Sequence, residues 1–298
     1  MVDITLKTNT LRTAIAQAVV KVGSEETIVA IKQGKVPKGN VFEMSKAAGL
    51  LGIKKTPQIL PDCHPIPIEH AAIEYEIDKL TIIIKVLVKT IYKTGVEVEA
   101  MHGASVVALN MYDMLKPIDK NVSISEIKLL EKNGGKSDFK DDFLQELTAS
   151  ILVVSSKIVS GQREDKVTPL VEKKLYDLGI SISNKSLVND DKIEIENAIN
   201  TLKESANIII VCGGTGVSKS DITPDVVKGM LTMDIPGIME QSRSFGQNLM
   251  PYSMLSRGVA GLINNTLIIT LPGSIGGVKE SMQALFPHCF HIFKSIPK

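Results

Sequence analysis

The chain has 298 residues, which at about 150 residues per domain predicts two domains. The formal net charge is +1, from 34 basic and 33 acidic residues, so the strong basic excess of a nucleic-acid binder is absent. Hydrophobic residues make up 44% and charged residues 22%, a composition that favours a globular chain over a disordered one. Aromatic residues are only 4%, so aromatic platforms for stacking nucleic-acid bases are not expected.

Membrane and disulfide-rich classes are also disfavoured. The longest apolar runs, 208–212 and 151–154, are far shorter than the ~18 residues of a membrane-spanning helix. The polar N-terminus lacks the pattern of a signal peptide. The three cysteines, Cys63, Cys212 and Cys289, lie far apart and form no CxxC pair, which argues against a disulfide framework or an iron–sulfur site. We therefore expect a cytoplasmic protein with neither nucleic-acid nor membrane partners.

Residues 1–140 mix helical and strand patterns. In chain order we expect a helix over 11–22 capped by Thr10, a helix over 42–51, strands over 73–77 and 80–88 joined by a turn at Asp78-Lys79, a buried helix over 98–115 and a strand over 124–130. The first helix is predicted from one apolar stripe of Ala14, Ile15, Ala18 and Val19. Hairpin strands beside separate helices predict an α+β domain.

The pattern changes after an acidic stretch, where we place a linker over 141–149. Beyond it we expect strands over 151–155, 180–188, 207–212 and 266–271 and helices over 169–178 and 192–205, with a further helix at the C-terminus. Apolar strands that alternate with helices predict a mostly parallel sheet with helices on both faces, which is a three-layer α/β domain over 150–298. Ligands of such sheets bind at the carboxyl ends of the strands.

A glycine-rich loop, Gly213-Gly214-Thr215-Gly216, directly follows the strand over 207–212. The backbone N–H groups of such a loop can cradle a phosphate or a carboxylate. It is neither a P-loop nor a GxGxxG motif, because Ser218 and Lys219 stand where those motifs need glycine. A tight turn without a ligand is the alternative. A second loop, Pro272-Gly273-Ser274, follows another strand, and two such loops predict a ligand longer than one phosphate.

Two carboxylates accompany these loops. Asp221 precedes a helix for which Thr223 is the expected N-cap, and Asp190 follows the strand over 180–188. The alternative role of Asp190 is to cap the next helix. Together, Asp190 and Asp221 can hold Mg²⁺ against substrate phosphates.

Beyond these motifs, the second half carries Asp221-Ile222-Thr223-Pro224-Asp225, Pro236-Gly237 with Glu240, Ser256-Arg257 and Lys279-Glu280. On this order of loops, residues 149–298 resemble the molybdopterin-binding family, which includes molybdopterin adenylyltransferase and molybdenum cofactor biosynthesis protein B. The resemblance implies that molybdopterin is adenylated with ATP and Mg²⁺, and that Asp190 and Asp221 are the aspartates that matter. The chain departs from the family at Ser156-Lys157-Ile158, where Ser-Asp-Arg is usual. A non-catalytic pterin-binding or assembly module is therefore the alternative.

In the first half, Asp113 and Lys116 lie three residues apart, on one face of the predicted buried helix. A surface ion pair is the simplest interpretation, worth ~0.3 kcal/mol. Buried ionisable groups, however, usually pair or act, and a lysine that supplies a proton beside an aspartate that orients or accepts one suits ring opening and phosphate attack. Cys63 and His64, between two prolines, have no second ligand cluster nearby to indicate a metal.

Further motifs in this half are Met1-Val2-Asp3, Lys38-Gly39, Ala47-Ala48-Gly49, Lys55-Thr56, Cys63-His64-Pro65, Lys93 to Ala100, Tyr112-Asp113-Met114 with Lys116, and Gly134-Gly135-Lys136-Ser137. On these, residues 1–140 resemble cyclic pyranopterin monophosphate synthase. The resemblance implies a ferredoxin-like fold in a hexamer of dimers and trimers. It also implies conversion, without a cofactor, of (8S)-3′,8-cyclo-7,8-dihydroguanosine 5′-triphosphate to cyclic pyranopterin monophosphate and diphosphate.

The positions to which this resemblance assigns a role fall into two groups. The catalytic group is Lys38, His64, Asp113 and Lys116. The substrate-binding group is Arg12, Asp62, Cys63, His64, Glu97, Val98 and Glu99.

Spacing adds an inference of its own. If 98–116 is one helix, Glu99 and Asp113 are separated by ~21 Å along its axis. A nucleotide-sized ligand cannot touch both in one chain, so we predict a homo-oligomer in which Asp113 and Lys116 meet Glu99 and His64 of a neighbour. That this homo-oligomer is hexameric or trimer-based is what the family resemblances imply. Without the resemblances, a phosphotransferase with an α+β regulatory domain is the alternative for the whole chain.

Overall fold

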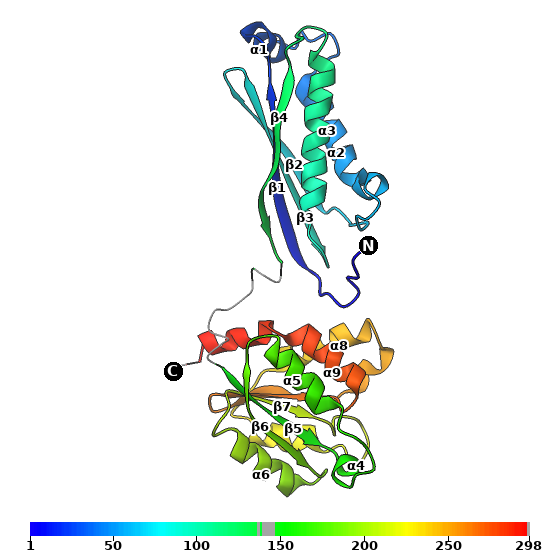
Figure 1. The fold of residues 1–298 in the computed structure, drawn as a ribbon, viewed down its shortest axis with the longest axis vertical. Helices are drawn as coiled ribbons and strands as arrows, with labels where there is room; N and C mark the ends of the chain where they lie inside the picture. Colours follow the sequence, from blue (N-terminus) through cyan, green and yellow to red (C-terminus); the bar gives the residue numbers. More distant parts are fainter. Residues whose placement is uncertain (136–137, 139–146, 297–298) are drawn as a thin grey trace. The chain divides into compact units, whose positions relative to one another are not determined.

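The computed structural model describes residues 1–135, 138 and 147–296, and the chain forms two compact units, residues 1–138 and 139–298 (Figure 1). Most of the predicted linker, together with Lys136 and Ser137, lies outside the described residues. At its C-terminal end, Thr148 and Ala149 already belong to a strand rather than a linker. None of the helices within the described ranges has the length and apolar character needed to cross a membrane.

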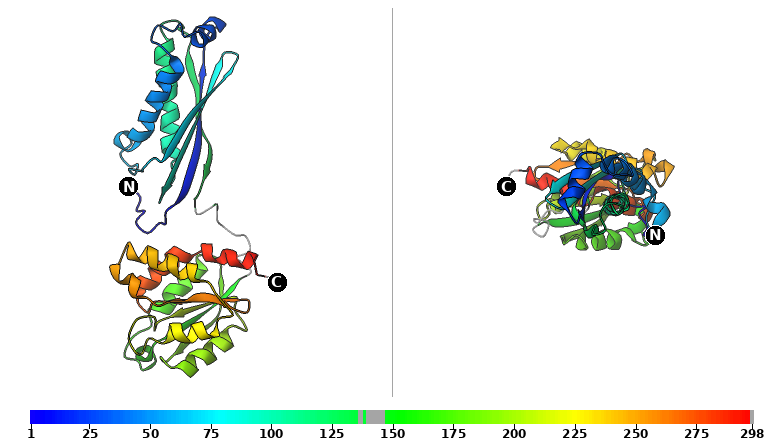
Figure 2. Two further views of the ribbon diagram at one scale, coloured as in Figure 1. Left: turned by 180° about the vertical axis from the view of Figure 1, so that it is seen from behind. Right: turned by 90° about the horizontal axis from the view of Figure 1, so that it is seen from above.

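The first unit is a four-stranded antiparallel sheet in the order β2-β3-β1-β4, with helices against it. Its elements are β1 (Thr10–Lys21), α1 (Glu25–Lys32), α2 (Val41–Ile59), β2 (His70–Asp78), β3 (Thr81–Tyr92), α3 (Glu97–Leu115) and β4 (Ser123–Asn133). Helices α2 and α3 pack on each other and lie on the same face of the sheet (Figures 1 and 2). The predicted α+β class therefore holds for this unit.

The prediction of a helix over 11–22 is wrong, because the segment forms strand β1. Ala14, Ala16, Ala18 and Val20 are fully buried with a period of two, and β1 hydrogen-bonds to β3 on one side and β4 on the other. Pairing on both edges and burial of one face outweigh the intrinsic helix preference of alanine, which is a weak prior. The small alanine side chains leave room for α3, which lies against β1.

Several other boundaries differ from expectation, and the end of α2 and the hairpin turn are two of them. Helix α2 continues past the predicted end at residue 51 to Ile59, with Pro57 inside its last turn. The hairpin turn lies one residue later than predicted, at Lys79-Leu80, with Lys79 in the left-handed region at φ 52°. The long buried helix is confirmed as α3.

Glycines set the distance between α2 and α3. A Cβ atom at Gly49 would overlap the side chain of Val107 on α3, and one at Gly103 would lie 2.5 Å from Ile53 on α2. Both positions therefore need a residue without a side chain.

We predict that Gly49→Ala lowers the free energy of unfolding of the first unit by about 1–3 kcal/mol, because the added methyl group overpacks the α2–α3 contact. Denaturant unfolding of the full chain, followed by circular dichroism, measures the change. Gly229→Ala is the matched control, because nothing lies within 4 Å of the added atom. Alanine there should raise the stability by about 1 kcal/mol through helix propensity. Equal effects of the two substitutions would contradict the packing argument.

The second unit is built on a six-stranded sheet in the order β6-β5-β7-β10-β9-β8. The strands are β5 (Thr148–Val154), β6 (Ser181–Val188), β7 (Ile208–Cys212), β8 (Met233–Asp234), β9 (Ala260–Ile263) and β10 (Thr266–Leu271). The helices are α4 (Ser156–Val159), α5 (Val167–Tyr176), α6 (Lys192–Leu202), α7 (Thr223–Met230), α8 (Pro236–Gln247), α9 (Ile275–Leu285) and the 3₁₀ segments η3 (Pro251–Leu255) and η4 (His288–Lys294). Strands β6, β5, β7 and β10 are parallel, and of these six strands only β9 runs antiparallel to its neighbours, β10 and β8, so the predicted mostly parallel sheet is confirmed.

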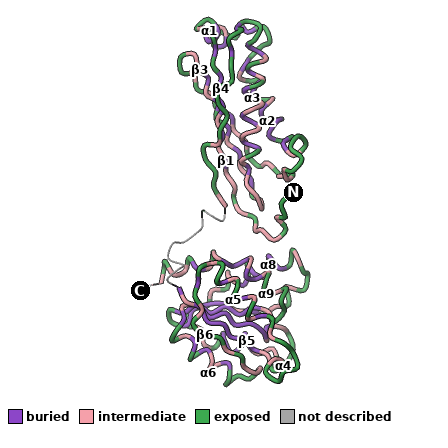
Figure 3. The backbone as a smooth tube through the Cα atoms, in the orientation of Figure 1, coloured by how far each residue is buried: buried purple, intermediate pink, exposed green. Residues whose placement is uncertain are grey.

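Helices cover both faces of this sheet. Along β7, Ile208, Ile210 and Cys212 join the core beneath α5, α8 and α9, whereas Ile209 and Val211 join the core beneath α6 and α7. All five residues are fully buried. Figure 3 shows that the central strands of this sheet are largely purple, the colour of buried residues. A strand buried on both faces carries no alternation, which is why its sequence is a continuous apolar run.

Candidate functional site

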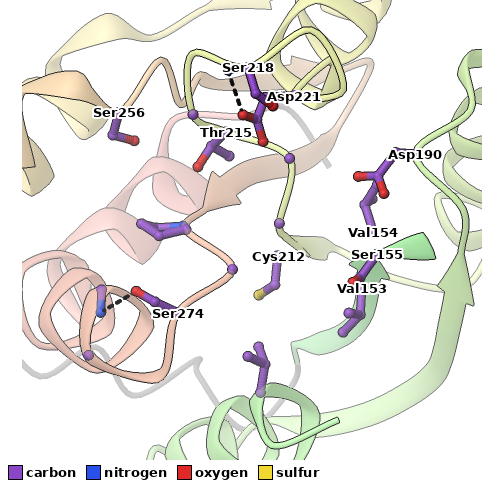
Figure 4. Close-up of a pocket in the computed structure, with 18 of the residues that line it drawn as sticks. Val153, Val154, Ser155, Asp190, Cys212, Thr215, Ser218, Asp221, Ser256 and Ser274 are labelled. Atoms are coloured by element: carbon purple, nitrogen blue, oxygen red, sulfur yellow. Dashed lines mark hydrogen bonds between the residues drawn. The ribbon is translucent and has the colours of Figure 1, made fainter. Parts of the chain in front are cut away.

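The four parallel strands of the second sheet, β5, β6, β7 and β10, end at the same edge, and the loops that follow them line one cavity (Figure 4). Cys212 at the end of β7 is in register with Leu271 at the end of β10 and with Val153 near the end of β5. The Gly213 N–H donates to the carbonyl oxygen of Leu271 over 3.0 Å. The cavity has a volume of about 700 Å³, and its lining includes Gly213-Gly214-Thr215-Gly216 and Pro272-Gly273-Ser274. The structure thus brings the two predicted glycine loops together.

Close backbone contacts explain the glycines. Gly213 has a φ of 109°, and a Cβ atom on it would overlap the carbonyl oxygen of Val154. A Cβ atom on Gly273 would lie 3.2 Å from the Cα atom of Gly213. At Gly213 the close approach of β5 and β7 therefore requires a residue without a side chain, and at Gly273 a small residue is favoured.

Asp190 lies at this cavity and is not the N-cap of α6. Its carboxylate accepts hydrogen bonds from the Ser156 N–H over 2.9 Å and the Ser156 hydroxyl over 2.8 Å. Asp191 caps α6 instead, accepting from the Glu194 N–H over 3.0 Å. The capping alternative for Asp190 is therefore wrong by one residue, and Asp190 lines the cavity.

Asp221 lines the same cavity from a different loop, and Figure 4 shows its carboxylate accepting a hydrogen bond from Ser218. Hydrogen bonds from Ser218, together with the nearby charge of Arg257, lower the pKa of Asp221, so it is a carboxylate at neutral pH. Arg257 also donates to the carbonyl oxygens of Gly216, over 2.8 Å, and of Asp221 itself, and pairs with Asp225 at 3.0 Å. One guanidinium thereby ties the glycine loop to the start of α7.

The predicted N-cap of α7 is off by one position. Ile222 occupies the N-cap, and Thr223 is the first helical residue. The Thr223 hydroxyl is buried and hydrogen-bonds to none of the described residues. It faces Gly214, where a Cβ atom would overlap it and would lie 3.5 Å from the Asp190 carboxylate.

The two carboxylates suit a Mg²⁺ ion that is completed by a ligand. Within residues 1–135, 138 and 147–296, no group of three or more His, Cys, Asp and Glu side chains could hold a metal. Mg²⁺ is commonly bound by one or two carboxylates together with substrate phosphates and water. Asp190 and Asp221, both lining a cavity beside glycine-loop N–H groups, match that donor set.

In the first unit, Asp113 lies between two lysines. Lys38 Nζ is 2.6 Å and Lys116 Nζ is 2.8 Å from its two carboxylate oxygens. Their hydrogen bonds lower the pKa of Asp113 to about 2. The side chain of Asp113 is 49% exposed in the single chain, so the expectation of a buried pair is wrong. Asp113 belongs to the last turn of α3, whose apolar residues face the core while Asp113 does not.

A second group of predicted residues lies near the start of α3. The Cys63 thiol donates to the Glu99 carboxylate over 3.3 Å, and Glu99 is only 2% exposed. Burial raises the pKa of Glu99, and burial together with Glu99 raises the pKa of Cys63 to about 11. The second carboxylate oxygen of Glu99 has no hydrogen-bond partner among the described residues.

The remaining predicted residues are spread around this group. His64 Nε2 donates to the Val2 carbonyl oxygen over 2.9 Å, and Asp62 pairs with the N-terminal ammonium group. Arg12 donates to the carbonyl oxygens of Tyr92 and Lys93. Glu97 pairs with Lys132 at 3.7 Å, and Val98 is 40% exposed.

Helix α3 separates the two groups. It is continuous from Glu97 to Leu115, with Lys116 at its C-cap, so Glu99 and Asp113 stay apart by ~21 Å along the axis. The structure of the single chain brings Lys38, Asp113 and Lys116 together, and Cys63 and Glu99 together. Within one chain the two groups remain apart. The prediction of a site shared by two chains depends on this separation.

Some cavity residues were not predicted. Lys157, Arg163, Glu280 and Tyr252 line the cavity, and sequence reasoning assigned none of them a site role. Arg163 lies in the loop after β5, beyond a turn at Gly161 with φ 75°. The glycine is the one sequence signal for that turn, and it does not show where the arginine points.

Comparisons with known proteins agree with the division of the chain into two units. The model of the MoaC family matches residues 1–135, and the model described as a probable molybdopterin binding domain matches residues 150–291. A molybdenum cofactor biosynthesis bifunctional protein from Chlorobaculum tepidum is 34% identical over 294 residues, covering 98% of this chain and 93% of that protein. The chain belongs to the family of bifunctional molybdenum cofactor biosynthesis proteins.

Each half of this bifunctional family member also has shorter relatives. A cyclic pyranopterin monophosphate synthase from Pelobacter propionicus is 46% identical over 140 residues, covering 46% of this chain and 86% of that protein. A solved structure of MogA is 35% identical and covers 50% of this chain and 99% of that chain, with a TM-score of 0.48. The chain thus acts in molybdenum cofactor biosynthesis, with a MoaC-type first unit and a second unit of the molybdopterin-binding type.

The two lysines beside Asp113 generate a prediction for its titration. Lys38→Ala or Lys116→Ala should raise the pKa of Asp113 from about 2 toward the ordinary value of about 3.9. Because the folded-state pKa is depressed, the pairing stabilises the folded chain above pH ~4 and the stabilisation is lost as the pH falls toward 2. Carboxyl NMR titration measures the shift, with Lys120→Ala as the control for an exposed lysine in the following turn. An unchanged pKa in both lysine variants would show that the pairing is absent in solution.

Proposed function

We propose that residues 1–138 convert (8S)-3′,8-cyclo-7,8-dihydroguanosine 5′-triphosphate to cyclic pyranopterin monophosphate and diphosphate. Membership of the family and the similarity to a synthase over 140 residues support this activity. The observation that carries it is the ionised Asp113 between two ammonium groups. The succession β-αα-β-β-α-β with sheet order β2-β3-β1-β4 also supports a ferredoxin-like fold for this unit.

The groups around Asp113 divide the chemistry between them. Because the pKa of Asp113 is about 2, it remains a carboxylate at neutral pH and orients its neighbours rather than donating a proton. Lys116, whose pKa the same carboxylate raises, keeps its proton until the reacting atom of the substrate takes it. Lys38 places a second positive charge 2.6 Å from Asp113, where it can hold a substrate phosphate.

We further propose a homo-oligomer in the cytoplasm whose first-unit site takes groups from two chains. A Lys116→Ala chain and a Glu99→Ala chain should each lose most diphosphate release from the cyclised GTP substrate. Mixed oligomers should regain part of it, because some sites then receive Lys116 from one chain and Glu99 from the other. Assembly of the mixed species is verified first by mass spectrometry.

The control mixture pairs Lys116→Ala with Lys120→Ala, since Lys120 lies outside both groups. No recovery in a verified Lys116→Ala and Glu99→Ala mixture would contradict the shared site. If each variant alone were as active as the unsubstituted chain, Lys116 and Glu99 would have no role in the reaction.

For residues 150–298 we propose that the cavity binds molybdopterin and adenylates it. The terminal phosphate oxygen of molybdopterin forms a bond to the α-phosphorus of ATP, the bond to the β-phosphate breaks, and pyrophosphate leaves. The N–H groups of Gly213–Gly216 and the loop at 272–274 suit phosphate oxygens, and Asp190 and Asp221 would hold Mg²⁺. The ion would neutralise phosphate charge. The role of Asp190 and Asp221 would be to position the Mg²⁺ ion at the edge of the sheet.

This activity is tested on the full chain with molybdopterin, ATP and Mg²⁺. We expect adenylated product and pyrophosphate, and a loss of at least about 100-fold in rate for Asp190→Asn or Asp221→Asn if each carboxylate positions the ion, which corresponds to about 2.7 kcal/mol. Asp177→Asn, at an exposed position after α5, is the matched control and should be unaffected. Binding of molybdopterin without pyrophosphate release would instead support the non-catalytic pterin-binding module, which the Ser156-Lys157-Ile158 departure favours.

The two proposed reactions are not consecutive steps. The product of the first carries no dithiolene sulfur, whereas molybdopterin does, so sulfur insertion must lie between them. Fusion of the units therefore does not imply direct transfer of a product from one to the other.

A further inference from the structure

The cavity of the second unit is lined by charged side chains to which the proposed reaction assigns no role. Three carboxylates line it, Asp190, Asp221 and Glu280, and two cations, Lys157 and Arg163. Arg257 is nearby but is engaged with Asp225 and backbone carbonyls. A polyphosphate that enters beside three carboxylates is repelled unless cations face it.

Lys157 and Arg163 are available for that task. The side chain of neither forms a hydrogen bond or an ion pair with any residue that the structure describes, and both are exposed. Lys166, in the same loop, differs, because it pairs with Glu164 at 3.4 Å and does not line the cavity. A cation that has no carboxylate partner can form charge-assisted hydrogen bonds to a bound anion without breaking an existing ion pair.

The backbone brings residues 157 and 163 side by side. Lys157 lies in the single turn of α4, and Gly161, with φ 75°, reverses the chain after it. The Arg163 N–H then donates to the Lys157 carbonyl oxygen over 3.0 Å. The neighbouring residue, Ser156, holds Asp190 through two hydrogen bonds, so the loop that carries the cations also positions a carboxylate.

We propose that Lys157 and Arg163 form a phosphate-binding wall of the cavity, which takes the phosphate groups of a nucleoside triphosphate or a pterin phosphate together with the glycine loops. This inference deepens the adenylation proposed above and rests on the same cavity. Arg163 is suited to the more specific contact, because its guanidinium can bind two phosphate oxygens at once. Lys157 acts as a point charge beside it.

The test uses the full chain and three probes, inorganic pyrophosphate, ATP with Mg²⁺, and uncharged adenosine, with affinities measured by isothermal titration calorimetry. Arg163→Ala and Lys157→Ala should each weaken pyrophosphate and ATP about tenfold, as expected for one hydrogen bond to a charged group. Affinity for adenosine should not change. Arg163→Lys should recover part of the loss, and Lys166→Ala, the control cation of the same loop, should bind all probes as the unsubstituted chain does.

The outcomes separate this inference from the proposed reaction. Pyrophosphate affinity that falls in Arg163→Ala, with adenosine affinity preserved, supports the wall even if no adenylated product forms. Unchanged pyrophosphate and ATP affinities in the Lys157→Ala, Arg163→Ala double variant overturn it, even if the chain adenylates molybdopterin. An unsubstituted chain that binds neither anion overturns it as well. Equal loss for adenosine and pyrophosphate would indicate a distorted loop and would also overturn it.

Discussion

The second unit depends on close contact between the carboxyl ends of three parallel strands. Gly213 lies so close to the Val154 carbonyl that a Cβ atom would overlap it, and a Cβ atom on Gly273 would lie only 3.2 Å from the Cα atom of Gly213. This contact fixes where the loops after β5, β7 and β10 begin, and hence where the glycine-loop N–H groups lie relative to Asp221 in the loop after β7 and Ser156 in the loop after β5, which holds Asp190. Positive φ angles at Gly213 and Gly214 then turn the chain immediately after the sheet. The cavity follows from this backbone constraint, and the polar side chains are added around it.

In the first unit the corresponding constraint is the packing of one long helix on a sheet of small residues. Alanines on β1 and glycines on α2 and α3 allow close approach of the backbones. A helix held so tightly along its length keeps its ends at a fixed separation. In the proposed homo-oligomer, the charged groups at the two ends of α3 would serve one ligand through another copy of the chain.

Sequence patterns predicted the second unit better than the first, for a physical reason. Strands buried on both faces are continuous apolar runs, and β10 was predicted with its observed bounds, Thr266–Leu271. The sequence of β1 fits a helix as well as a strand, because its apolar residues Ala14, Ile15, Ala18 and Val19 share one helical stripe while the alanines recur at every second position, and only pairing with the two neighbouring strands decides. The choice between Asp190 and Asp191 as a cap depends on one residue of register. Arg163 reaches the cavity through a loop, where no periodicity exists to read.

The charges at the two ends of α3 are complementary, and this bears on what a shared site would bind. At one end, two ammonium groups surround a single carboxylate, Asp113, which leaves a positive excess for phosphates. At the other end, Glu99 is buried with one oxygen accepting from Cys63 and the other unpaired among the described residues. An unpaired buried carboxyl oxygen costs free energy until a donor reaches it. A substrate with a triphosphate at one end and ring N–H groups at the other satisfies both demands at once. A single chain, with its ends ~21 Å apart, can satisfy only one of them.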